Sequence, residues 1–509
     1  MSQKIKLNEN KICEVALNLF KELNKNNINY CHFKSNAHID DSIYWETDFD
    51  IIVDEENFNK FKDIIKLFKF KEVISQPWSK YKNVYDFVWL DEKTWKIIHL
   101  HTHLKIVTGT KFVKEYIIPF WKLFLNKNYQ TNIFDIKVPK KELEFLLLIF
   151  RIWLKTSNKQ INKNILPENI EEEILYLKDL NKEILYKLIK KNISVNNQDF
   201  IKKISNNILN WKIIWSDLKK LKKIIKKELK NYKTTNFIFL KKFFYKYYEI
   251  FRAINFRILK RYSHHKKNFK NWWFSVTILW PDWAWKSTII KQLQKDFLYK
   301  INTQTFYLWT WDWEKNISLL LFQKLLKFAW IWQKENNWKN KKDNNINNEV
   351  KSKWLIYDTI AWFYYYLISK DKKDKIKNIL NHKRHWVLCL IDRFPQEQFC
   401  WINDWISCFN KNKIKTKWFL SKYFFKKEKQ NYNFCLQNQP DLIIKLKIDS
   451  KTAYNRKKDY DKSHNLKNIE EKIKIIENLK FNTETIEIDA KLPLKKVILN
   501  IKNQIWKRL

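Results

Sequence analysis

The segment FSVTILWPDWAWKST, residues 274–288, decides the fold expected for this chain of 509 residues. Its apolar start, Phe274 to Leu279, has the composition of a buried strand, and we expect a helix from Lys286 onward. A strand-to-helix junction this short needs a tight turn, whose residues must accept unusual backbone angles. The segment instead places tryptophan in the turn at positions 280, 283 and 285.

The composition of the whole chain shows the same anomaly. The chain has 26 tryptophans and a single glycine, Gly109, whereas glycine normally makes up roughly 7% of a protein and tryptophan is rare. Pooled, the two types come to about 5% of the residues, close to the usual glycine content. Some bacterial lineages translate the codon UGA as glycine, and a table that assigns UGA to tryptophan would exchange the two residues. We therefore hypothesise that most tryptophans of this sequence stand for glycine.

The positions of the tryptophans favour this hypothesis over a genuinely tryptophan-rich protein. Trp95 follows the polar run Asp91 to Thr94, and the run Trp309 to Trp313 alternates tryptophan with polar residues. Turns of this kind use glycine because glycine adopts positive φ without steric cost. Trp153, inside the apolar run Phe150 to Leu154, is the best candidate for a genuine tryptophan.

With glycine at the three turn positions, the segment becomes L-G-P-D-G-A-G-K-S-T and matches the phosphate-binding pattern G-x-x-x-x-G-K-[ST]. The backbone N–H groups of such a loop converge on phosphate oxygens, and the helix that follows adds its positive dipole end. Lys286 would reach the β- and γ-phosphates and Ser287 would bind Mg²⁺. As written, Trp280 and Trp285 would fill the phosphate site. The predicted nucleotide-binding residues are Trp280, Pro281, Asp282, Trp283, Ala284, Trp285, Lys286, Ser287 and Thr288.

The restored loop resembles the G-x-D-G-x-G-K-S-T loop of thymidylate kinase-like proteins, and later segments do so too. The run Trp386 to Phe394 is similar to that group's G-x-V-x-x-x-D-R-[YFH] strand, the run Pro440 to Leu446 to its P-D-L strand, and the run Ala453 to Lys457 to the start of its mobile lid. The resemblance covers residues 270–509 and implies a P-loop kinase with a parallel sheet that uses ATP and Mg²⁺.

This resemblance implies roles for individual residues. The cationic side chains that would surround the transferred phosphate are Lys286, Arg393, Arg456 and Lys457. Asp392 would hold Mg²⁺ through water or fix Arg393, and a purely structural ion pair of Arg393 is the alternative. Asp282 points to the acceptor side in this group. The family's arginine-containing loop after the second strand has no counterpart in the run Tyr307 to Trp313, so the acceptor stays open.

The N-terminal part contains a different pattern. Lys34-Ser35-Asn36 and a restored glycine at Trp45 precede Asp48 and Asp50, an arrangement that resembles the glycine turn and D-x-D strand of nucleotidyltransferases. Carboxylates at i and i+2 share one strand face, where they can bind Mg²⁺ and position a nucleoside triphosphate.

The third carboxylate of that family is missing from the position where it is expected. A later strand offers His99, His101 and His103 on one face instead, and Asp86 is a candidate substitute. The histidines could complete a metal site or serve as polar residues of a sheet surface. The joined order resembles two-domain proteins that we associate with surface-polysaccharide genes.

The chain is therefore expected to be an α/β protein of three parts. These are a small nucleotidyltransferase-like domain over residues 1–140, a basic helical connector over residues 141–269, and the kinase domain over residues 270–509.

Charge and cysteine content constrain partners and compartment. The formal charge of +45 fits a nucleic-acid or membrane partner, or it reflects the lysine usage of an AT-rich genome, which the even spread of lysines favours. The aromatic helix at residues 239–262 could lie on a membrane or dock against a domain. Six cysteines lack C-x-x-C spacing and no signal peptide is evident, so reduced thiols and a cytoplasmic location are expected.

The leading hypothesis is an ATP- and Mg²⁺-dependent kinase that acts on a small molecule or nucleotide and is inactive in the tryptophan form. The first alternative places the main reaction, nucleotidyl transfer, at Asp48 and Asp50. The second alternative is a non-catalytic basic scaffold that binds nucleic acid or membrane.

Overall fold

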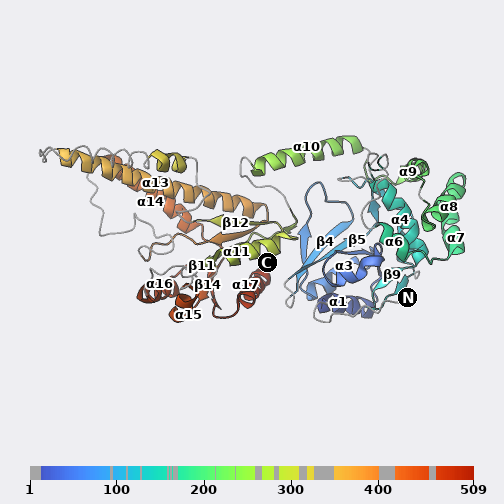
Figure 1. The fold of residues 1–509 in the computed structure, drawn as a ribbon, viewed down its shortest axis with the longest axis horizontal. Coiled ribbons are helices and arrows are strands. Elements are labelled where there is room, and N and C mark those ends of the chain that lie inside the picture. Colours follow the sequence, from blue (N-terminus) through green and yellow to red (C-terminus); the bar gives the residue numbers. More distant parts are fainter. Residues whose placement is uncertain are drawn as a thin grey trace. The chain divides into compact units, whose positions relative to one another are not determined.

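The computed structural model describes residues 13–91, 96–109, 113–126, 129–156, 160, 163, 170–212, 214–235, 237–257, 266–279, 286–308, 318–325, 349–399, 419–457 and 466–509. They belong to two compact units, Met1–Lys270 and Asn271–Leu509. Both units are mixed α/β (Figure 1), which confirms the expected fold class. The three-domain division stays a prediction.

The first unit is built on a six-stranded sheet in which only one neighbouring pair, β2 with β5, is parallel. Its strands, in sheet order, are β1 (Tyr30–His32), β2 (Phe49–Val53), β5 (Ile97–His103), β4 (Val84–Leu90), β3 (Lys71–Ile74) and β10 (Asn268–Phe269). Two short hairpins pair β6 (Val107–Thr108) with β7 (Tyr116–Ile117) and β8 (Tyr129–Thr131) with β9 (Lys137–Pro139).

Each face of this sheet has its own hydrophobic core, because alternate residues of a strand point to opposite faces. Phe49 and Ile51 of β2 pack with α1 (Glu14–Lys25) and α3 (Phe58–Leu67). Ile52 belongs to the other core, which includes most of the helices that follow. Asp48 and Asp50 have the parity of Ile52, so they share its face.

The helices after residue 140 pack on that second face, and Figure 1 shows α4 and α6 to α9 gathered beside the sheet. They are α4 (Lys141–Lys155), α6 (Ile170–Tyr176), α7 (Lys182–Asn192), α8 (Val195–Leu209) and α9 (Trp215–Glu228). The next helix along the chain is α10 (Ile238–Arg257). Shorter helical turns are η2 (Asn36–His38), α2 (Ile39–Ile43), η3 (Trp121–Phe124) and η4 (Lys230–Tyr232).

The second unit has a five-stranded sheet whose neighbouring pairs are all parallel. Its strands, in sheet order, are β12 (Thr303–Tyr307), β13 (Leu388–Asp392), β11 (Ser275–Leu279), β14 (Leu442–Lys447) and β15 (Glu484–Asp489). Its helices are α11 (Lys286–Leu298), α13 (Glu349–Arg384), α14 (Phe419–Gln437), α15 (Ser450–Lys457), α16 (Leu466–Asn478) and α17 (Leu494–Arg508). The expected strand before residue 280, the helix after it and the parallel sheet are confirmed.

Among the residues that the structure describes, three tryptophans have left-handed backbone angles: φ is 55° at Trp45 and 58° at Trp211 and Trp386. All three follow the end of a helix in the same hydrogen-bond pattern. At Trp211, for example, the N–H of Trp211 donates to Ile208 O at 3.1 Å and the N–H of Lys212 donates to Asn207 O at 2.8 Å. This is the Schellman motif, whose left-handed position is most often glycine.

Other tryptophans occupy ordinary helix or strand positions. Trp89 is buried in β4, Trp506 in α17 and Trp362 in α13, where its ring centroid lies 5.2 Å from that of Phe425 on α14. Glycine is unfavourable in the interior of helices and strands. The backbone thus separates tryptophans in glycine-type turns from tryptophans that pack in a core.

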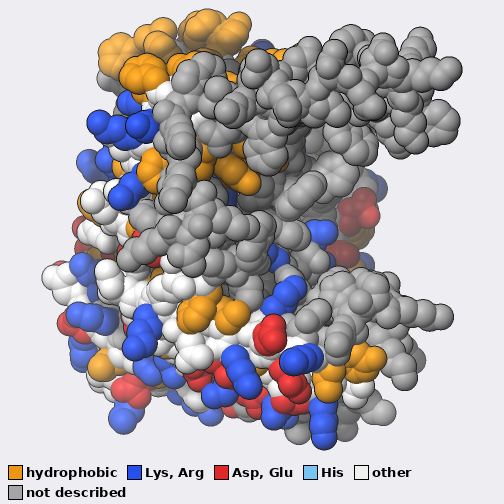
Figure 2. Space-filling model, turned by 90° about the vertical axis from the view of Figure 1, so that its left-hand side faces the viewer, with side chains coloured by type: hydrophobic (Ala, Val, Ile, Leu, Met, Phe, Trp, Pro, Cys, Tyr) orange, Lys and Arg blue, Asp and Glu red, His pale blue; other side chains and the backbone are white. Residues whose placement is uncertain are grey.

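Charged side chains of both signs lie on the described surface. On the face in Figure 2, Lys and Arg side chains are spread out, with Asp and Glu between them in the lower half. α10 exposes many aromatic side chains, and Phe244, Tyr248 and Phe251 line a cavity of about 400 Å³ together with Pro77. Among the described residues, no helix combines the length and apolar character that crossing a bilayer requires. The membrane, nucleic-acid and cytoplasmic predictions stay predictions.

The described cysteines are Cys13, Cys31, Cys389 and Cys435, and each is a buried free thiol. Burial raises the pKa of Cys13 to about 12, so this thiol is unreactive at neutral pH.

Candidate functional site

The predicted phosphate loop joins β11 to α11. Residues Trp280 to Trp285 lie outside the described residues. Lys286 and Ser287 open α11, but their side chains are not described, and Thr288 is exposed on its first turn. The strand and helix therefore stand where a phosphate loop requires them, and the nucleotide contacts stay predictions.

Asp392 lies at the edge of the sheet from which this loop starts. It is in register with Ile278 of β11 on one side and with Tyr307 of β12 on the other, and its side chain is 2% exposed. All three strands end at this edge, because they are parallel. Ligands of open α/β sheets bind at the carboxyl ends of the strands, and Asp392 lies at such an end; its role in a site stays a prediction.

Arg393 follows Asp392 in a left-handed conformation, with φ at 65° and a buried side chain. Such angles cost a non-glycine residue on the order of 1–3 kcal/mol and concentrate at functional sites. The next turn is fixed by Gln396, whose Oε1 accepts hydrogen bonds from the N–H groups of Gln398 and Phe399, both at 2.8 Å. Gln396 was not foreseen from the sequence.

The predicted lid residues lie at the end of α15. The guanidinium of Arg456 donates to the carbonyl oxygens of Ala490 at 2.9 Å and Lys491 at 3.3 Å, and burial lowers its pKa. In this arrangement Arg456 anchors the chain after β15. Lys457 closes the helix, but its side chain is not described. Their catalytic roles stay predictions.

Asp441 of the P-D-L segment has a structural place. Its Oδ2 accepts from the N–H and the Oγ–H of Ser275, each at 2.7 Å, and Lys383 pairs with the same oxygen at 2.7 Å. These contacts tie the amino ends of β11 and β14 together, at the opposite edge of the sheet from Asp392.

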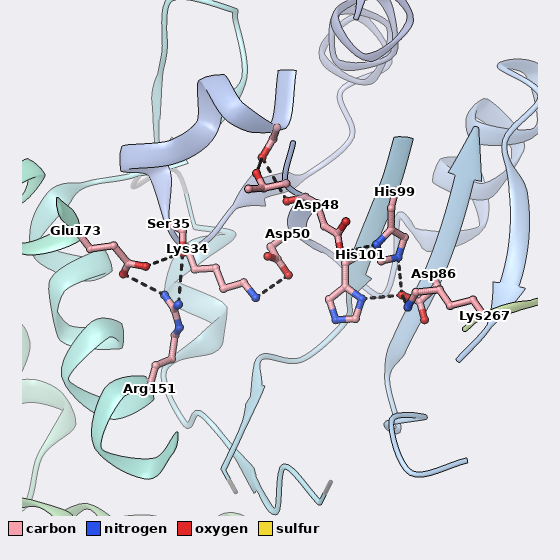
Figure 3. Close-up of polar contacts among 12 residues, drawn as sticks. Lys34, Ser35, Asp48, Asp50, Asp86, His99, His101, Arg151, Glu173 and Lys267 are labelled. Atoms are coloured by element: carbon pink, nitrogen blue, oxygen red, sulfur yellow. Dashed lines mark hydrogen bonds and ion pairs between the residues drawn. The ribbon is translucent and has the colours of Figure 1, made fainter. Parts of the chain in front are cut away.

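The acidic and histidine residues of the first unit form a row across three strands (Figure 3). Asp50 on β2 is in register with His101 on β5, and His101 is in register with Asp86 on β4. The structure therefore brings Asp86 beside the predicted metal-binding aspartate, with His101 between them. Asp86, weighed as the substitute carboxylate, lies in this row.

Asp86 is the acceptor for several groups. Its Oδ1 lies 2.8 Å from His99 Nε2, 2.7 Å from His101 Nδ1 and 3.0 Å from Lys267 Nζ, and its Oδ2 accepts from Ser75 Oγ at 2.5 Å. Burial alone would raise the pKa of Asp86, but the hydrogen bonds from the histidines hold it well below its ordinary value. Asp86 is therefore an anion whose acceptor positions are in use.

His99 bridges Asp86 to Asp48, because its other ring nitrogen, Nδ1, lies 2.7 Å from Asp48 Oδ2. Burial opposes a charged imidazole, but Asp48 and Asp86 outweigh it and raise the pKa of His99 above its ordinary value. The result is a buried chain of alternating carboxylates and imidazoles.

Lysines neutralise this row. Lys34 Nζ lies 2.7 Å from Asp50 Oδ1, and this cation and the neighbouring histidines outweigh burial and hold the pKa of Asp50 well below its ordinary value. Burial, followed by the nearby Lys34, lowers the pKa of Lys114 to about 8. Lysines 34, 114 and 267 come from widely separated parts of the chain, and the last two were not foreseen.

The turn of Lys34, Ser35 and Asn36 is held by the helices on this face. Ser35 has a φ of 57° and donates its Oγ–H to Glu173 Oε1 at 2.8 Å. Asn36 donates its N–H and its Nδ2–H to the two oxygens of Glu144 at 2.9 and 2.8 Å. Burial raises the pKa of Glu144 to about 7. The helices after residue 140 thus help to build the site.

Comparisons with known proteins give a distant relative. No protein-family model matches the chain. The chain is 24% identical over 225 residues to the "Uncharacterized ATP-binding protein YghR" of Escherichia coli strain K12 and equally to that of Escherichia coli O6:H1, which covers 44% of this chain and 83% of those proteins.

Among solved structures, deoxyadenosine kinase from M. mycoides has a TM-score of 0.25 with products bound, at 13% identity, and 0.25 with dATP bound, at 16% identity. Both matches cover 46% of this chain and 98% of that chain. At these TM-scores the likeness adds no argument to the topology described above.

Proposed function

We propose that the unit Asn271–Leu509 is an ATP- and Mg²⁺-dependent phosphotransferase, similar to thymidylate kinases, that acts on a nucleotide or another small molecule. The observation that carries this proposal is the junction from β11 to α11 beside Asp392. A strand, a loop with the restored pattern G-x-x-x-x-G-K-S and a helix follow in the order that phosphate binding requires. The similarity to a protein named as ATP-binding supports it.

The residues of this edge fit such a reaction. In-line phosphoryl transfer depends on positioning and on positive charge around the transferred group. Lys286 would neutralise the phosphates, Ser287 and Asp392 would hold Mg²⁺, and Arg393 would face the acceptor side. Mg²⁺ suits a buried carboxylate and a hydroxyl because it prefers oxygen ligands, and when bound it neutralises charge on the phosphates.

We further infer that the functional protein has glycine at the turn tryptophans. The left-handed angles at Trp45, Trp211 and Trp386 support this inference, because glycine adopts them without the strain of a Cβ. The gene's codons test it directly. UGA is expected at these positions and at 280, 283 and 285, while UGG there would contradict the inference, as would tryptic peptides whose masses contain tryptophan.

The decisive experiment compares the full chain as written with a form in which Trp280, Trp283 and Trp285 are glycine, called here the glycine form. We expect only the glycine form to bind ATP and to transfer its γ-phosphate to one member of a panel of nucleosides, nucleotides and sugars. Equal ATP binding by both forms would contradict the restored loop. Failure of both, with steeply salt-dependent binding of polyanions, would favour the scaffold alternative.

Nucleotidyl transfer in the first unit is the second candidate, and the row of Asp50, His101 and Asp86 favours it. The residues fit the usual pair of Mg²⁺ ions poorly. Asp48 is paired with His99 and Asp50 with Lys34, and an imidazole stands between Asp50 and the third carboxylate. Pyrophosphate release that disappears in Asp48→Asn but not in Lys286→Ala would establish this candidate.

A further inference from the structure

His103 is the most unusual side chain of the first unit. It is 2% exposed, and neither ring nitrogen has a hydrogen-bond partner in the part of the chain that the structure describes. Its ring packs against Phe33, with centroids 5.0 Å apart, and against His101, with centroids 4.6 Å apart. A buried polar group without a hydrogen-bond partner destabilises the fold, so this position calls for a ligand.

His101 presents a free lone pair to the same place. Its Nδ1 must donate a hydrogen to Asp86 Oδ1, 2.7 Å away, because a carboxylate can only accept. In the neutral ring Nε2 then carries the lone pair. A carboxylate that orients a histidine in this way is the usual outer partner of a metal-bound imidazole.

Asp50 completes a set of three ligands. One donor atom from each of Asp50, His101 and His103 lies within 4.8 Å of the others. A second group, Asp86 with His99 and His101, meets the same distance limit. In that group Asp86 already accepts from two histidines, Lys267 and Ser75. Only the first group contains a buried histidine that needs a partner.

We propose that Asp50, His101 and His103 bind one divalent transition-metal ion, with Zn²⁺ as the reference ion. Two imidazoles and one carboxylate suit Zn²⁺ and its neighbours in the first transition series, whereas Mg²⁺ prefers oxygen ligands. Asp86 serves as the positioning residue of His101. The bound ion neutralises Asp50 in place of Lys34. Three protein ligands leave one coordination position for water or substrate.

Metal binding to the full chain, stripped with a chelator and kept free of nucleotide, tests this proposal. We expect calorimetry with Zn²⁺ in excess Mg²⁺ to show one ion per chain. His103→Gln should weaken binding more than tenfold, and Asp86→Asn should weaken it about 10- to 100-fold although it leaves all three ligands in place. His385→Gln, in the other unit, is the control and should bind as the wild type does.

Co²⁺ provides a readout that does not depend on the stability of the variants. The wild-type chain should show visible absorption bands of Co²⁺ bound to nitrogen and oxygen ligands, and Zn²⁺ should abolish them. Unchanged Zn²⁺ affinity in His103→Gln would overturn the proposal, as would effective competition by Mg²⁺ or the absence of the Co²⁺ bands. These measurements do not involve Lys286, so their outcome is independent of the proposed kinase activity.

Discussion

In the first unit the acidic residues of the site already have cationic partners, since Lys34 forms an ion pair with Asp50 and Lys267 forms one with Asp86. In the kinase site proposed for the second unit, the positive charge around Asp392 would come from Lys286 and from the backbone of the loop before it. The first arrangement is a preformed network of side chains across strands. The second depends on a turn that only glycine allows to close around phosphate. Replacing one charged residue of each site should therefore affect phosphate transfer very differently in the two units.

The largest expected effect separates the two sites by function. In the glycine form, Lys286→Ala should lower phosphate transfer by on the order of 10²–10³-fold or more, because a positioned cation stabilises the transition-state charge. Asp48→Asn should leave the rate within about twofold, because Asp48 contributes to the other site. Steady-state kinetics with labelled ATP measures both.

The reverse result would place the reaction in the first unit. Loss of activity in Asp48→Asn with a normal rate in Lys286→Ala would contradict the assignment of phosphate transfer to the second unit. Lys291, five residues along α11 from Lys286, provides a matched lysine control, and Lys291→Ala should retain the wild-type rate.

Stability distinguishes the core tryptophans from the turn tryptophans. Trp362→Ala should cost about 3–5 kcal/mol of unfolding free energy, because the indole is buried between α13 and α14 beside Phe425. Urea unfolding of the second unit checks this. Codon UGG is expected at position 362. A loss below about 1 kcal/mol would indicate that this tryptophan also stands for glycine.

Glu144 should make the stability of the first unit depend on pH. Its folded pKa of about 7 lies above its ordinary value of 4.5, so the folded state retains a proton that the unfolded state releases. This effect destabilises the fold as pH rises from about 4.5 to about 7, by up to about 3 kcal/mol.

The variant Glu144→Gln removes this titration and keeps an acceptor for Asn36. The stability of Glu144→Gln relative to wild type should therefore increase between about pH 5 and about pH 8. Hydrogen exchange of the amides in β1 and α4 measures it locally. A relative stability that is equal at both pH values would refute the raised pKa. Asp179→Asn, at an exposed carboxylate paired with Lys141, controls for general charge effects.

The sequence predicted the parts of both sites that lie close together in the chain. The strand from position 274, the helix after it and the parallel sheet follow from local patterns, and Asp48 and Asp50 follow from their spacing on one strand. Lys267 and Glu144 were missed, because they reach the first site from segments more than 100 residues from the acidic or amide group that they contact. No local pattern marks such partners.

Two turn positions could be predicted from the tryptophans themselves. The hypothesis that tryptophan stands for glycine predicts turns at Trp45 and Trp386, and both occupy the left-handed position of a helix end. Arg393 has the same type of angle without a glycine-like signal in the sequence. Its side chain is buried directly after the end of β13.

The smallest expected effect is the change in stability when the turn tryptophan Trp211 is replaced by glycine. Trp211 is 42% exposed, so its removal forfeits less burial than removal of a core tryptophan, and its φ of 58° strains any residue with a Cβ. Trp211→Gly should stabilise the first unit by roughly 0.5–1 kcal/mol, the relief of strain being partly offset by the greater freedom of glycine in the unfolded chain. Trp211→Ala removes the same indole but keeps the Cβ, so it should give no gain. Urea unfolding of the two variants side by side measures the difference, and equal stability of the alanine and glycine variants would show that the left-handed angle does not select glycine at this helix end.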